Sequence, residues 1–144
     1  MSYLLDTNVV SELRKSERRA DPRVRSWIAS RASSDLHLSV ITILEIEVGI
    51  GLVGRRDRVH ARRLQGWLDD QLLAAFAGRI LPIDIPVARR AARLQVPDPR
   101  PERDALIAAP AAVHGLTLVT RNVKNFEVLD VAIVDPWEQR GGDA

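Results

Sequence analysis

Three acidic residues that lie far apart in the chain, Asp6, Glu45 and Asp104, could perform chemistry together. Asp6 follows a short apolar segment expected to be a strand, Glu45 lies near the apolar side of a predicted helix, and Asp104 lies in the first turn of another. Carboxylates brought within a few ångströms repel one another, so they cannot all stay ionised without a cation. Their convergence would therefore create a site for Mg²⁺ or Mn²⁺, which could activate water and stabilise the charge on an attacked phosphate.

Each of these acids also has an ordinary structural explanation. Asp6 could simply cap a helix, and an acid at Asp104 suits the positive end of a helix dipole. Glu45 is harder to explain in this way, because a buried glutamate requires a partner. Thr7 and Asn8 would either orient Asp6 or a bound water, or cap the helix that follows.

Other kinds of metal or nucleophilic site are disfavoured by the composition. The chain has no cysteine, which excludes a disulfide framework, a thiolate zinc site and a cysteine nucleophile. The three histidines, His37, His60 and His114, share no metal-ligand spacing, so we assign them no catalytic role. Oxygen ligands are therefore expected for any metal.

The elements that must position these acids alternate between strands and helices. Short apolar strands are predicted at residues 3–6, 36–39, 79–82, 116–119 and, more weakly, 131–134. Helices are predicted behind Asp6 and over residues 22–28, 40–54, 57–76, 85–94 and 102–113, with a proline-rich connection at residues 96–101. This alternation predicts an α/β fold whose sheet of four to five strands is mostly parallel and covered by helices on both faces. Functional groups then gather at the carboxyl ends of the strands.

Length and composition indicate one domain over residues 1–144. Hydrophobic residues make up 46% of the chain, enough for a core. The amino terminus lacks the apolar core of a secretory signal, and no apolar run approaches the roughly 20 residues of a membrane span. The cytoplasm is the expected location.

The net charge is only +2, but arginine outnumbers lysine by 19 to 2. Arginines cluster at residues 14–25 and 55–63. Guanidinium groups suit phosphate recognition, but genomic composition bias and solvated helix faces are the more common explanation of any single cluster. The charge therefore permits a nucleic-acid partner without requiring one.

Four segments, LLDTNVVSEL, LSVITILEIEVGIG, RDALIAAPAAVHGLTLVTRNVKNF and VDPW, together resemble the PIN-domain ribonucleases, especially the VapC and FitB toxins of type II toxin–antitoxin systems. The resemblance covers nearly the whole chain in the expected order. It implies an α/β/α sandwich and Mg²⁺- or Mn²⁺-dependent endoribonuclease activity. It also implies that Asp6, Glu45 and Asp104 are the catalytic acids and metal ligands, with Thr7 and Asn8 beside them.

The chain departs from the family pattern at two places. The family often carries a fourth acid at the position of Asn122 or Asn125, and both are amides here. We retain Asn122 as a catalytic-pocket residue, and expect three acids to hold cations more weakly than four. Pro110 replaces a common threonine inside a predicted helix, where it can cost about 3 kcal/mol and predicts a kink that could move Asp104.

The resemblance also implies an RNA substrate, a cognate antitoxin and a homodimer. Antitoxin contacts are expected on helices around five apolar residues, each of which is more typical of a core: Val9, Leu13, Trp27, Ile50 and Leu52. Two other functions compete with the nuclease. A haloacid-dehalogenase-type phosphatase would require an aspartate at the position of Asn8, and an RNA- or partner-binding module would have lost turnover through Asn122 and Pro110.

Overall fold

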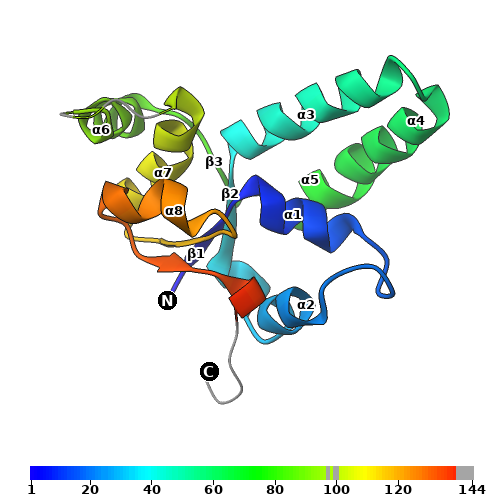
Figure 1. The fold of residues 1–144 in the computed structure, drawn as a ribbon, viewed down its shortest axis with the longest axis horizontal. Helices are drawn as coiled ribbons and strands as arrows, with labels where there is room; N and C mark the ends of the chain where they lie inside the picture. Colours follow the sequence, from blue (N-terminus) through cyan, green and yellow to red (C-terminus); the bar gives the residue numbers. More distant parts are fainter. Residues whose placement is uncertain (97, 99–100, 139–144) are drawn as a thin grey trace.

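A parallel sheet of five short strands forms the centre of the computed structural model, which describes residues 1–96, 98 and 101–138. The strand order is β3-β2-β1-β4-β5 (Figure 1). The strands are β1 (Tyr3–Leu5), β2 (Leu36–Ser39), β3 (Ile80–Leu81), β4 (Thr117–Val119) and β5 (Ile133–Val134). All four pairings are parallel, which confirms the predicted sheet.

Helices cover both faces of this sheet, as predicted. They are α1 (Thr7–Arg14), α2 (Pro22–Ala29), α3 (Val40–Gly54), α4 (Arg58–Trp67), α5 (Leu73–Ala75), α6 (Ile85–Leu94), α7 (Glu102–His114) and α8 (Val123–Phe126). Figure 1 shows α1 to α5 on one side of the sheet and α6 to α8 on the other. Each helical layer packs against one face of β1. Leu5 lies in a core with Val9 and Trp27, whereas Leu4 lies in a second core with Ile107 and Phe126.

The central position of β1 determines where the candidate site lies. Leu4 pairs with His37 of β2 on one side and with Leu118 of β4 on the other. Asp6, the next residue after β1, donates its backbone N–H to the Val119 carbonyl at 2.9 Å. Asp6 is thereby fixed at the middle of the carboxyl edge of the sheet.

Local sequence signals account for the beginnings of two helices next to this edge. The Asp6 carboxylate accepts the Thr7 N–H at the start of α1, and the Ser39 hydroxyl accepts the Ile41 N–H at the start of α3. Helix α3 has the bounds predicted for it, Val40 to Gly54. It carries Glu45 to the same edge of the sheet that Asp6 occupies.

The segment predicted as one helix over residues 57–76 differs from that prediction. A π-helical turn (Leu68–Leu72) separates α4 from α5, and Leu68 and Leu72 are buried within it. The sequence pattern did not reveal this wider turn, because both leucines fit an ordinary helical face as well.

Helix α7 is continuous from Glu102 to His114 although Pro110 lies inside it and is buried. The proline therefore does not end the helix, and the kink remains a prediction. Gly115, at φ 66°, ends the helix in the left-handed conformation that favours glycine. Pro97 and Pro99 of the predicted proline-rich connection lie outside the described residues.

None of the helices in the described part of the chain is long and apolar enough to cross a bilayer.

Candidate active site

Asp6, Glu45 and Asp104 line one pocket of about 290 Å³ at the carboxyl edge of the sheet. They come from the end of β1, the second turn of α3 and the first turn of α7. All six residues that the sequence singled out line this pocket: Asp6, Thr7, Asn8, Glu45, Asp104 and Asn122. The fold thus gathers residues separated by more than a hundred positions in the chain around one opening.

Asp6 is buried and held by several donors. The Thr120 hydroxyl donates to its Oδ2 at 2.8 Å, and the Thr7 backbone N–H donates to Oδ1 at 2.8 Å. Burial raises the pKa of Asp6, the two hydrogen bonds oppose this rise, and repulsion from Glu45 and Asp104 adds to it. Burial is thus the main cause of the raised pKa of Asp6, and the negative charge of the other two acids adds to it.

Glu45 is oriented by a pair of hydroxyl groups. The Thr7 hydroxyl lies 2.6 Å from Oε1 of Glu45 and 3.1 Å from the hydroxyl of the fully buried Thr42. Since each hydroxyl has one proton, Thr42 can donate to Thr7 while Thr7 donates to the carboxylate. On its outer side, Glu45 Oε2 lies 4.0 Å from Nη1 of Arg103, a long ion pair with a largely exposed arginine.

Asp104 completes the acidic lining of the pocket. Burial raises its pKa, and the nearby Glu45 carboxylate raises it further. Both effects favour the protonated acid in the absence of a neutralising cation.

The chemistry of these donors suits a hard divalent cation, because the pocket offers carboxylate and amide oxygens and its acids repel one another. Among the residues that the structure describes, however, no group of three or more His, Cys, Asp or Glu side chains is gathered closely enough to form a metal-ligand set. The acids thus share one pocket without forming a closed ligand set.

Thr120 is a site residue that sequence reasoning missed. It is fully buried, and besides donating to Asp6 it accepts the Asn122 backbone N–H at 3.0 Å. This hydroxyl therefore links the acid at the end of β1 to the loop after β4. Its position as the first polar residue after a buried strand was a signal that could have identified it.

Glu12 lies outside this pocket. It lies on α1 and is buried, and its Oε2 lies 2.8 Å from Nζ of Lys15. That oxygen makes no well-angled hydrogen bond within the described residues, whereas Oε1 accepts one from Lys15 at 3.0 Å. The short distance between these opposite charges stabilises both groups within the fold.

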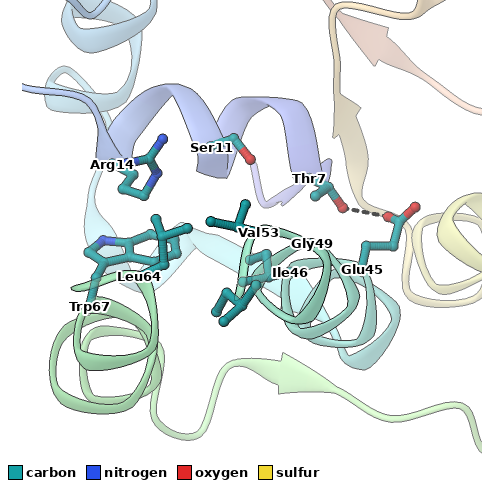
Figure 2. Close-up of a pocket in the computed structure, with 10 residues that line it drawn as sticks. Thr7, Ser11, Arg14, Glu45, Ile46, Gly49, Val53, Leu64 and Trp67 are labelled. Atoms are coloured by element: carbon teal, nitrogen blue, oxygen red, sulfur yellow. Dashed lines mark hydrogen bonds between the residues drawn. The ribbon is translucent and has the colours of Figure 1, made fainter. Parts of the chain in front are cut away.

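An apolar groove of about 220 Å³ adjoins the acidic pocket. It lies between α1, α3 and α4 and shares Thr7, Ser11 and Glu45 with the pocket. Figure 2 shows the hydrogen bond between Thr7 and Glu45 at one end of the groove, with Leu64 and Trp67 at the other. Of the five apolar residues expected to contact a partner, Leu52 is exposed and Ile50 lines this groove. Ile50, Val9 and Trp27 are buried core residues, and the partly buried Leu13 packs against the same core.

The fold and site together define an α/β/α protein that carries a carboxylate pocket at the carboxyl edge of a parallel sheet. The PIN-domain family model matches residues 3–131, and the chain belongs to this family.

Two relatives and one solved structure are similar to this chain over nearly their whole length. The VapC ribonuclease Y4jK of Sinorhizobium fredii is 37% identical over 142 residues, covering 94% of this chain and 97% of the relative. The toxin FitB of Neisseria gonorrhoeae is 38% identical over 141 residues, covering 93% and 97%. The crystal structure of FitAcB from the same organism matches with a TM-score of 0.86 at 36% identity, covering 95% of this chain and 99% of that one.

Proposed function

We propose that this chain is a divalent-metal-dependent endoribonuclease that acts as the toxin of a toxin–antitoxin pair. The observation that carries the proposal is the convergence of Asp6, Glu45 and Asp104 on one pocket, where the other two acids contribute to the raised pKa of Asp6. The relatives named as a VapC ribonuclease and as a toxin support the same activity.

In this proposal Asp6, Glu45 and Asp104 hold Mg²⁺ or Mn²⁺. When bound, such a cation supplies an activated water and stabilises the charge that develops on the phosphodiester. Thr7 orients both Asp6, through its backbone N–H, and Glu45, through its hydroxyl. Asn122, at the rim of the pocket, offers an amide that can position the RNA or a water but adds no charge.

The proposed antitoxin occupies the apolar groove between α1, α3 and α4. Its lining is mostly apolar and it ends at Glu45, so an apolar segment that carries a basic side chain would complement both parts. A toxin–antitoxin complex from Klebsiella pneumoniae contains a chain that is 27% identical to this one and matches it with a TM-score of 0.68, which supports a protein partner.

A homodimer is the second association that we propose. Leu44, Val48 and Leu52 recur at intervals of four residues along α3 and are exposed, which is typical of a helix face that packs against another helix. We further propose that the protein works in the cytoplasm, where RNA is accessible to it.

The test of the activity is Asp6→Asn. This change keeps an acceptor for the Thr7 N–H but removes the charge, so we expect it to abolish RNA cleavage and growth inhibition while the circular dichroism spectrum stays unchanged. Asp70→Asn, at an exposed acid outside the pocket, is the matched control and should cleave like the wild type.

A magnesium titration distinguishes the alternatives. A nuclease should cut RNA only as the cation is added, whereas a binding module would hold RNA and leave it uncut at every concentration. Full cleavage by Asp6→Asn would refute the assignment of the acids, and a phosphorylated Asp6 trapped with a phosphate ester would indicate a phosphatase instead.

A further inference from the structure

A second cavity, of about 520 Å³, adjoins the acidic pocket through the shared residue Asn122. It lies at the carboxyl ends of β4 and β5, where α8 begins. Its charged lining residues are Arg121, Lys124, Glu127, Asp135 and Glu138. We propose that this cavity binds a nucleobase, and specifically a guanine next to the scissile phosphate, an inference that rests on the proposed ribonuclease function.

The charge of the cavity argues for a base rather than a phosphate as the ligand. Three of its charged side chains are acidic and two are basic, so a phosphate would meet net repulsion. A nucleobase is neutral and offers N–H donors that carboxylates accept. The acidic lining therefore suits the edge of a base.

Arg121 provides a surface on which a base can stack. Its guanidinium carbon lies 5.2 Å from the ring centroid of Trp137, which is buried beneath it. The backbone N–H of Arg121 also donates to Oδ1 of Asn8 at 3.4 Å, which ties the residue to the acidic pocket. Since the arginine side chain is exposed, its outer face can receive an unpaired base, as guanidinium planes commonly do in complexes with single-stranded RNA.

Asp135 provides the selectivity. It follows β5 directly, and its Oδ1 accepts the Trp137 backbone N–H at 2.9 Å, which fixes the carboxylate. Guanine presents N1–H and N2–H₂ side by side and so offers two donors to one carboxylate. The corresponding edges of adenine, cytosine and uracil each mix donors with acceptors. A fixed carboxylate beside a stacking surface therefore favours guanine over the other three bases.

The first experiment is cleavage of a randomised single-stranded RNA pool in Mg²⁺, with the products sequenced. The wild type should show guanine enriched at one position next to the cut. In Asp135→Asn the amide oxygen still accepts the Trp137 N–H, but its NH₂ group faces the donors of guanine. We expect the enrichment to fall about tenfold or more while total cleavage is retained.

Arg121→Lys tests the stacking surface, because it keeps the positive charge and removes the planar guanidinium group. KM for guanine-containing substrates should rise about tenfold with kcat unchanged. Arg89→Lys, the same change at an exposed arginine on α6 that lies outside this cavity, is the control and should alter neither constant. Retention of guanine enrichment in Asp135→Asn, or an absence of base preference in the wild type, would overturn the subsite while leaving the nuclease assignment intact.

The second experiment separates the subsite from catalysis. Fluorescence anisotropy measures the binding of four short RNAs, identical except for one base, to Asp6→Asn. Tighter binding of the guanine-containing RNA, lost on adding Asp135→Asn, supports the subsite even if the wild type cuts no RNA. Equal binding of all four overturns it.

Discussion

Thr120→Val would remove one hydroxyl group from beneath the acidic pocket and change little else in shape. Thr120 is fully buried, and its hydroxyl makes the 2.8 Å hydrogen bond to Oδ2 of Asp6. Valine has nearly the same volume but no donor. The substitution therefore isolates one of the interactions that favour the ionised form of Asp6.

The size of the effect follows from the strength of such a bond. Hydrogen bonds to charged groups contribute about 1.5–3 kcal/mol, and one pKa unit corresponds to about 1.4 kcal/mol. Loss of the bond should thus raise the pKa of Asp6 further, in the same direction as burial does. The Asn122 N–H also loses its acceptor, which should lower the free energy of unfolding by about 1 kcal/mol.

The assay is the rate of RNA cleavage in Mg²⁺ as a function of pH. In the proposed mechanism the ionised form of Asp6 is the active one, so the acidic limb of the profile should move to higher pH by about one unit or more in Thr120→Val. Thr120→Ser keeps the hydroxyl and should behave like the wild type. Thr117→Val makes the same chemical change on β4 at a residue outside the pocket and should leave the limb in place. An unmoved limb in a folded Thr120→Val protein would refute this account of how Asp6 is held.

Two further predictions concern stability and the groove. Because the pKa of Asp6 is raised on folding, its contribution to stability is fully present below the ordinary value of 3.8 and is lost as pH rises through the folded value. In urea unfolding, Asp6→Asn should therefore be more stable than the wild type at neutral pH, and Mg²⁺ should stabilise only the wild type. If the free energies of unfolding of the two proteins change with pH in parallel, this prediction is wrong. Gly49 lines the groove on α3, and a Cβ there would meet nothing within 4 Å. Gly49→Leu should raise the free energy of unfolding by up to about 1 kcal/mol and weaken binding of the proposed antitoxin, as measured by calorimetry. Unchanged affinity would show that the partner does not occupy this groove.

The fold was predictable because its signals are local. Apolar runs of three or four residues followed by helical spacing identified the strands, and caps such as Asp6 and Ser39 mark where α1 and α3 begin. Asp6 and Glu45 could be chosen as site residues for a related reason, since one directly follows a strand and the other is an acid on an apolar helix.

The interactions that hold these acids could not be predicted in the same way. Thr42 and Thr120 are fully buried hydroxyls whose partners lie 35 and 114 positions away in the chain, so only the folded structure pairs them with Thr7 and Asp6. The burial of Glu12 and the π turn at Leu68–Leu72 also depend on tertiary packing rather than on a sequence pattern.

The apolar groove and the cavity proposed to bind a base adjoin the acidic pocket through different residues. The apolar groove shares Thr7 and Glu45 with the pocket, whereas the cavity proposed to bind a base shares Asn122. An occupant of the groove would thus meet the Thr7–Glu45 hydrogen bond without contacting Asn122. Since Thr7 also donates its backbone N–H to Asp6, a partner that displaces this threonine would disturb two of the three acids at once. Inhibition by a groove-bound partner therefore does not require it to fill the cavity in which the base is expected.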